Sequence, residues 1–195
     1  MLKGIPAIIP PELMKILMEM GHGDELLICD GNYPKFGCPE RCVRMDGHGI
    51  PEILDAILQF MPLDPYVENP TILMAVLPGD PYKPEIWETY LEIGKKHEEK
   101  GLREIAVQKP EFYPRGAKCY ACIATSETAL YANIILKKGV VIPSSVISSP
   151  PFYPFHGQPC CGARLSSFYR QKKRPARDAP ALFLSAAFRI SPLFR

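Results

Sequence analysis

The sequence lacks any run of the 18 or more apolar residues that a transmembrane helix requires. Residues 1–6 also do not lead into the long apolar stretch of a secretory signal peptide. We therefore expect a cytoplasmic protein with no membrane partner. In that reducing compartment its seven cysteines, an odd number, are expected to be mostly free thiols.

Motifs for phosphate and for metal ions are also missing. No glycine-rich loop has the Walker or dinucleotide-binding pattern, which argues against a phosphorylated ligand. Cys38 and Cys42 have no second pair placed as in a zinc ribbon. Cys119 and Cys122 are three residues apart on a predicted strand, where side chains at that spacing point to opposite faces. We expect no metal site.

Acidic residues are nearly absent from the last part of the chain. Residues 141–195 hold eight Lys and Arg, one Asp and eight prolines, whereas residues 1–140 hold 15 basic and 20 acidic residues. We expect one domain over residues 1–140 and a basic, proline-rich, mostly unstructured tail over residues 141–195. The basic run at 170–177 could attract nucleic acid or acidic lipid. A solvated tail without a nucleic-acid partner is the favoured interpretation.

Helical and strand patterns alternate along residues 1–140. Helices are predicted over residues 11–20, 51–61 and 83–100, and residues 112–118 could add one helical turn. Strands are predicted over residues 26–30, 42–45, 71–77, 104–108, 119–125 and 133–137. At least two strands are apolar on both faces, which indicates a sheet covered by helices on both sides. We predict a single three-layer α/β/α domain with a central mixed sheet.

Polar side chains gather at the predicted strand ends and in loops. They are His22, Asp30, Asp64, Tyr113, Tyr131 and Asn133. Carboxylates and amides bind pairs of hydroxyls, and tyrosines combine a flat apolar face with a polar tip. Such a set suits a neutral polyhydroxylated ligand. Asp30 ends its strand, and ligands of open α/β sheets bind at the carboxyl ends of strands.

His22 lies between two glycines directly after the first predicted helix. Histidine has an ordinary pKa close to neutrality, so an imidazole in such a position can give or take a proton at physiological pH. Taken alone, a histidine between glycines is more often a turn residue without a chemical role. The motifs that surround it therefore decide how it is interpreted.

These motifs resemble the ribose pyranase/fucose mutarotase family, and most closely its branch that acts on L-fucose. The resemblance runs nearly continuously through residues 1–140, and residues 141–195 have no counterpart in the family. The matching stretches include Met20-Gly21-His22-Gly23-Asp24-Glu25, Asp30-Gly31-Asn32-Tyr33-Pro34, Leu63-Asp64-Pro65-Tyr66, Phe112-Tyr113-Pro114-Arg115 and Thr128-Ala129-Leu130-Tyr131-Ala132-Asn133.

The resemblance implies an isomerase that interconverts the α and β anomers of free L-fucose by acid/base ring opening and closure. It implies no metal and no organic cofactor. His22 matches the family's proton donor and Tyr113 a second catalytic position. The positions that match sugar contacts are Asp30, Asp64, Met74, Tyr131 and Asn133. The resemblance also implies a homo-oligomer whose sites are completed near subunit contacts.

Several alternatives stay open. Met74 lies in an apolar strand and could be simple core, and Asp64 could cap a turn beside Pro65. Ala132 stands where the family has glycine, and if that position has a positive φ, alanine would strain the loop. Alternative functions are a ribose pyranase, which also interconverts pyranose and furanose forms, and a sugar-binding homologue without activity.

Overall fold

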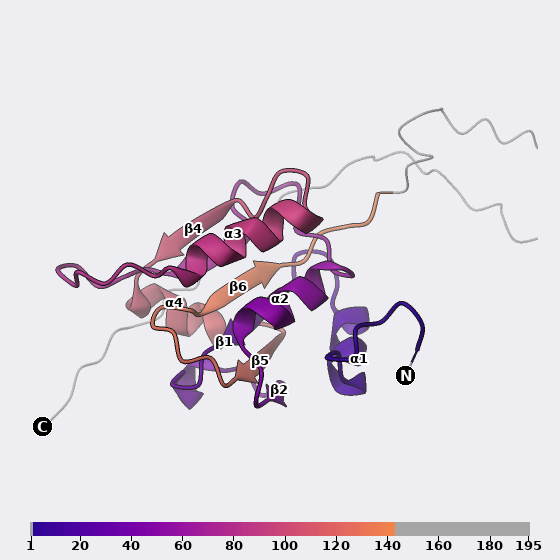
Figure 1. Ribbon diagram of the computed structural model, residues 1–195, viewed down its shortest axis with the longest axis horizontal. Helices are drawn as coiled ribbons and strands as arrows, with labels where there is room; N and C mark the ends of the chain where they lie inside the picture. The colour runs from indigo at the N-terminus through magenta and orange to yellow at the C-terminus, as the bar shows by residue number, and fades with distance from the viewer. Residues whose placement is uncertain (1, 143–195) are drawn as a thin grey trace, which may run out of the picture. The chain divides into compact units, whose positions relative to one another are not determined.

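The computed structural model describes residues 2–142 of the chain (Figure 1). From residue 143 onward the predicted tail lies outside the described residues, so the tail and the division of the chain near residue 140 stay predictions. None of the helices within residues 2–142 has the length and the hydrophobicity of a transmembrane span.

Helices and strands alternate through the described residues much as the sequence predicts. The helices are α1 (Pro11–Glu19), η1 (Lys35–Gly37, a 3-10 helix), α2 (Ile50–Leu58), α3 (Ile86–His97) and α4 (Lys109–Gly116). The strands are β1 (Glu25–Cys29), β2 (Cys42–Met45), β3 (Thr71–Met74), β4 (Glu104–Val107), β5 (Ala121–Thr125) and β6 (Ile134–Lys137).

The strands form one mixed sheet in the order β2-β5-β1-β6-β3-β4. β6 is antiparallel to both of its neighbours, β1 and β3, and the other neighbouring pairs are parallel. Five strands therefore point one way. Their carboxyl ends and the start of β6 share one edge, which we call the carboxyl edge. Their amino ends and the end of β6 share the opposite edge, the amino edge.

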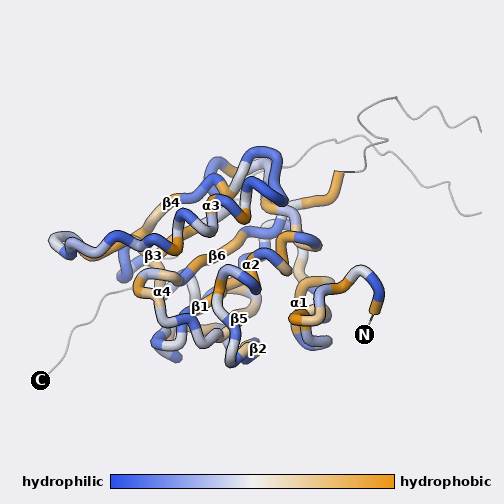
Figure 2. The backbone as a smooth tube through the Cα atoms, in the orientation of Figure 1, coloured by the Kyte–Doolittle hydropathy of each residue, from blue (hydrophilic) through white to orange (hydrophobic). Residues whose placement is uncertain are grey.

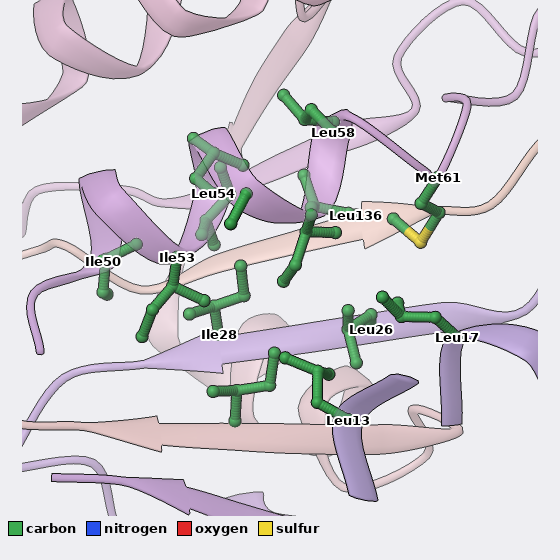
Figure 3. Packing of buried hydrophobic residues seen from close by; sticks show 14 of the residues in the cluster. Leu13, Leu17, Leu26, Ile28, Ile50, Ile53, Leu54, Leu58, Met61 and Leu136 are labelled. Carbon is green, nitrogen blue, oxygen red and sulfur yellow. The ribbon is translucent and has the colours of Figure 1, made fainter. Parts of the chain in front are cut away.

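Helices cover both faces of this sheet. Buried side chains of α1, α2 and α3 form one cluster with β1, β5 and β6, and in Figure 3 Ile53 of α2 lies beside Ile28 of β1. On the other face, Phe112 of α4 packs on residues of β1, β3 and β5. In Figure 2 the helices α2 and α3 alternate between apolar and polar residues along their length. The predicted three-layer α/β/α domain with a mixed sheet is confirmed.

α4 is longer than the single helical turn that the sequence suggests. Pro110 occupies the first turn, where its missing N–H has no partner to lose. Burial of Phe112 anchors the helix although Pro114 interrupts its hydrogen bonds. Gly116 lets α4 approach η1 closely, because a Cβ there would lie 2.8 Å from the carbonyl oxygen of Gly37.

The argument that separated Cys119 from Cys122 is wrong. β5 begins at Ala121, so Cys119 precedes the strand and the alternation of strand side chains does not apply to it. Both thiols are buried in the same cluster beneath α4.

Candidate active site

A cavity of about 180 Å³ opens at the carboxyl edge of the sheet. We call it the carboxyl-edge pocket. Asp30 enters it directly after β1 and Asn133 directly before β6, because β6 runs against β1. Its other lining residues are Asn32, Tyr33, Pro34, Met74, Lys109, Tyr113, Leu130 and Tyr131. Five predicted site residues, Asp30, Met74, Tyr113, Tyr131 and Asn133, thus meet in one place.

Asp30 and Asn133 hold each other in a fixed orientation. The backbone N–H of Asp30 donates to Asn133 Oδ1 at 2.8 Å, and Asn133 Nδ2 donates to Asp30 Oδ2 at 2.6 Å. The backbone N–H of Asn32 donates to the other carboxylate oxygen at 2.9 Å. Burial raises the pKa of Asp30, and this effect exceeds the lowering by its hydrogen bonds to Asn32 and Asn133. The carboxylate keeps lone pairs free to accept hydroxyl groups.

Tyr113 lies within a group of aromatic rings at the pocket. Its ring meets those of Tyr33 and Phe36 edge-on, with centroids 5.4 Å apart in each pair. Burial and the negative charge of Asp30 raise the pKa of Tyr113. The phenol therefore stays neutral at physiological pH, where it can both donate and accept a hydrogen bond.

Tyr131 is held by a second group of residues. Its hydroxyl donates to Asp80 Oδ2 at 2.6 Å, and Lys109 Nζ lies 5.3 Å from its ring centroid. Its φ is 57°, in the left-handed region, whereas Ala132 does not have a positive φ. The condition for strain at the alanine is therefore not met, and the unusual backbone lies one residue earlier.

Two aromatic side chains of α3 hold the backbone around this unusual residue. Trp87 Nε1 donates to the carbonyl oxygen of Tyr131 at 2.9 Å, and the Tyr90 hydroxyl donates to that of Ala132 at 2.8 Å. Both side chains look like plain core residues in the sequence. Buried Trp and Tyr side chains need hydrogen-bond partners for their polar atoms. That requirement is the sequence signal that could have indicated their role.

His22 and Asp64 meet at the amino edge, and we call them the amino-edge pair. His22 Nε2 lies 3.2 Å from Asp64 Oδ1, and the imidazole side chain is 46% exposed whereas the carboxylate side chain is 3% exposed. Burial raises the pKa of Asp64, but the Tyr66 amide and His22 outweigh it and hold the pKa below its usual range. The Tyr66 N–H donates to Asp64 Oδ1 at 3.0 Å, so Asp64 also caps the turn at Pro65.

The turn that carries His22 is fixed from two sides. Gly21 N–H donates to Asp24 Oδ2 at 2.7 Å, and Gly23 N–H donates to the carbonyl oxygen of Lys138 at 2.8 Å. Gly23 has a φ of 88°, a conformation that favours glycine. The backbone conformation of the turn therefore explains the glycine after His22. The imidazole of His22 lies at the surface.

The structure does not bring all seven predicted site residues together in one chain. His22 precedes β1 and Asp30 follows it. The five residues of β1 span roughly 16 Å at about 3.3 Å per residue. The amino-edge pair and the carboxyl-edge pocket are therefore two separate groups of predicted site residues, which we call the half-sites. Met74 is both core and lining, since it is buried and its sulfur lies 3.9 Å from Asn133 Nδ2.

The donor groups at both half-sites are those of hydrogen bonding and proton transfer. Among residues 2–142, no group of three or more His, Cys, Asp or Glu side chains is arranged to hold a metal ion. The carboxyl-edge pocket offers a carboxylate, an amide and a neutral phenol, which suit hydroxyl groups. The amino-edge pair offers an imidazole braced by a carboxylate.

Comparison with known proteins gives consistent results. The model of the RbsD / FucU transport protein family matches residues 3–141. The chain is 42% identical over 153 residues to a protein of Bos taurus named fucose mutarotase, covering 74% of this chain and 97% of that protein.

Solved structures give the same relationship. The fucose mutarotase from Streptococcus pneumoniae, crystallised in complex with L-fucose, aligns with a TM-score of 0.68 and 50% identity, over 72% of this chain and all of that one. Bacillus subtilis RbsD complexed with D-ribose aligns with a TM-score of 0.56 at 22% identity, over 73% of this chain and all of that one. The latter similarity supports the fold alone.

Proposed function

The chain belongs to the RbsD / FucU transport protein family, and we propose that it interconverts the α and β anomers of free L-fucose. The observation that carries this proposal is the carboxyl-edge pocket, in which the paired Asp30 and Asn133 line the same small cavity as Tyr113. Relatives named fucose mutarotase support it over nearly their whole length. We also propose a cytoplasmic location, as expected from the sequence.

Mutarotation needs only proton transfers. A proton reaches the ring oxygen while another leaves the anomeric hydroxyl, the hemiacetal C–O bond breaks, and the open aldehyde rotates. Closure on the other face of the carbonyl reverses these transfers, so that atoms and charge balance. One acid and one base that work near neutrality are enough, and positioned proton transfer typically contributes about 10²–10⁴-fold.

We assign His22 as the proton donor and Tyr113 as its catalytic partner. Because the Tyr113 phenol stays neutral, it can receive one proton while it releases another. Asp30, Asn133, Asp64, Met74 and Tyr131 are proposed to contact the sugar. The Asp30–Asn133 pair is already oriented by its own hydrogen bonds, so little ordering is left for substrate binding to impose.

These roles require two copies of the chain. His22 and Tyr113 lie at opposite edges of the sheet, so a sugar in the carboxyl-edge pocket cannot reach its own chain's imidazole across β1. We propose a homo-oligomer in which the amino-edge pair of one copy faces the carboxyl-edge pocket of the next. The exposed imidazole of His22 is placed for such an encounter.

Anomer exchange measured by saturation-transfer NMR tests the proposed reaction. Purified full-length protein is added to L-fucose, and the exchange rate between the anomeric protons is compared with that of L-fucose alone. We expect acceleration in proportion to enzyme concentration, unaffected by a chelator. Exchange at the uncatalysed rate in saturating L-fucose would contradict the proposal.

The two alternative functions give different outcomes in the same experiment. A ribose pyranase would accelerate exchange between the ring forms of D-ribose and leave L-fucose unchanged. A sugar-binding homologue without activity would shift protein resonances on addition of L-fucose without accelerating exchange. The identity to a fucose mutarotase, 50%, against 22% to the ribose complex, favours L-fucose.

A further inference from the structure

The position of the Asp64 carboxylate depends on the short loop that carries it. Asp64 is nearly fully buried and begins a turn through Pro65 and Tyr66. Asp and Pro are favoured at the first and second positions of such turns. The Asp64 N–H donates to the carbonyl oxygen of Lys137 at 3.1 Å, which ties the start of the loop to the end of β6. The rest of the turn needs a further anchor.

Arg103, just before β4, supplies that anchor. One guanidinium nitrogen, Nη2, donates to the carbonyl oxygen of Asp64 at 2.8 Å, and the other, Nη1, donates to that of Val67 at 2.7 Å. A single planar group therefore joins the first and last residues of the turn. The guanidinium fork suits two acceptors at once, whereas an ammonium group is a point charge.

Two features of Arg103, its backbone conformation and one of its buried nitrogens, are energetically unfavourable. Arg103 has a φ of 50°, in the left-handed region that residues with a Cβ seldom adopt. Its Nε is buried and has no hydrogen-bond partner within residues 2–142. The preceding residue is fixed, because Leu102 is buried and its carbonyl oxygen accepts from Thr71 Oγ1 at 3.0 Å. Unfavourable backbone conformations that the surrounding structure fixes are found mostly at functional sites.

We propose that Arg103 is a positioning residue, which acts through the Asp64–Val67 turn to hold the Asp64 carboxylate against His22. The catalytic consequence rests on the proposed function, in which His22 is the proton donor. Removing the guanidinium loosens the turn, so the carboxylate drifts from the imidazole. Misplacing a reactive group by about 1 Å can cost about 100-fold in rate.

The test measures the pKa of the Asp64 carboxyl group by carbon-13 NMR titration. The charged and hydrogen-bonding groups that face this carboxylate are His22, the Tyr66 amide and Lys137. In the parent protein they hold the pKa of Asp64 below its usual range. Arg103→Gly removes the guanidinium and relieves the left-handed backbone, and we expect it to raise the Asp64 pKa toward the ordinary value for aspartate. An unchanged Asp64 titration would overturn the proposal.

Arg103→Lys separates position from charge. It keeps one positive charge but cannot join both carbonyls in the same way, so we expect the Asp64 pKa to rise here too, by less than in the glycine variant. A lysine variant that titrates like the parent would mean that charge alone is responsible, and would also overturn the proposal. This variant serves by itself if Arg103→Gly does not fold.

Ile53→Val is the matched control for a general loss of stability. Ile53 is fully buried in the cluster that α1, α2 and α3 form with the sheet, and its apolar side chain cannot form a hydrogen bond with His22 or Asp64. Its substitution is expected to lower stability while leaving the Asp64 titration unchanged. A shift of the same size in this control would show that the Asp64 pKa follows stability and would contradict a specific role for Arg103.

Exchange rates complete the test. In otherwise parental protein, Arg103→Gly is expected to slow L-fucose exchange by about 10- to 100-fold, and in an Asp64→Asn background it is expected to add little. Full additivity of the two substitutions would contradict action through Asp64. If the parent itself does not exchange L-fucose, the proposed function fails while the Asp64 titration still decides the role of Arg103.

Discussion

The two edges of the sheet are built differently. At the carboxyl edge, Asp30 and Asn133 bind each other, and side chains of the same chain line the pocket around them. At the amino edge, His22 reaches outward from a turn, where the buried Asp64 carboxylate holds its ring nitrogen and the Tyr66 ring lies edge-on to the imidazole. The first half-site is formed before any ligand arrives. The second exposes an imidazole at the surface, where in the proposed homo-oligomer it faces a neighbouring copy.

Strand direction explains this division. Parallel strands gather their following residues at one edge and their preceding residues at the other. A residue before β1 and a residue after it are separated by the length of the strand, whatever their order in a sequence motif. The comparison between the edges predicts that damage at each has a different signature: the proton donor is lost at the amino edge, and sugar binding, stability or the role of Tyr113 is lost at the carboxyl edge.

The largest expected effect comes from removing the imidazole of the amino edge. His22→Ala is expected to lower the rate of L-fucose exchange by about 10²–10⁴-fold, the usual contribution of a positioned acid. Little packing is lost because the imidazole is nearly half exposed, but stability is expected to fall because the buried Asp64 carboxylate keeps only the Tyr66 amide of these two partners. The measurement is saturation-transfer NMR with His48→Ala as the control, since His48 is exposed and paired with Glu52. Exchange unchanged by His22→Ala would contradict the assignment.

At the carboxyl edge, Tyr90→Phe is expected to act first on stability. Its hydroxyl donates to the carbonyl oxygen of Ala132, and both residues are fully buried. Leaving a buried acceptor unpaired costs about 1–3 kcal/mol. Urea unfolding gives the change in free energy, with Tyr82→Phe at the partly exposed Tyr82 as the control. A Tyr90→Phe protein as stable as its parent would show that this carbonyl needs no partner.

A smaller effect is expected from Lys109→Met, and it is a shift in pH dependence. The positive charge of Lys109 lowers the pKa of Asp30, against the larger effect of burial. Without it the pKa of Asp30 rises further, so the carboxylate is protonated at higher pH. If ionised Asp30 binds the sugar, the acid limb of kcat/KM moves to higher pH. The exposed Lys95→Met is the control, and a limb that moves to lower pH would contradict the assignment.

The smallest expected effect is that of restoring the family's glycine with Ala132→Gly. Since Ala132 is fully buried and its φ is not positive, glycine relieves no strain there. The added freedom of the unfolded chain is expected to cost roughly 0.5–1 kcal/mol of stability. Thermal unfolding measures this change. A more stable glycine variant would mean that the alanine is strained after all.

Much of the fold could be predicted from the sequence because periodicity reports burial directly. The strand over residues 42–45 was predicted with its observed ends, and the first helix differs by one residue at its end. α4 was underestimated, because Pro114 argues locally against a helix that burial of Phe112 then stabilises. Cys119 was predicted to lie in a strand that in fact begins at Ala121, because the ends of a strand depend on its pairing with the neighbouring strands.

Less of the site could be predicted. Residue types indicated a neutral hydroxylated ligand, and the pocket brings together Asp30, Tyr113 and Asn133 as that interpretation requires. The strand predicted over residues 26–30 already implies that His22 and Asp30 lie at opposite edges, whereas the position of Asp64 beside His22 depends on the sheet topology, which no local motif contains. Arg103 acts through backbone carbonyl groups, which carry no mark in the sequence, and for Trp87 the one signal was that a buried indole N–H needs a partner.

Mixing two damaged chains tests most directly the claim that the half-sites meet between copies. His22→Ala lacks the amino-edge acid, Asp30→Asn lacks the carboxyl-edge carboxylate, and each is expected to be nearly inactive alone in L-fucose exchange. When they are refolded together in equal amounts, random assembly pairs intact half-sites in about one quarter of the sites, and that fraction of parental exchange is expected. A mixture no more active than the two chains measured separately would contradict the account.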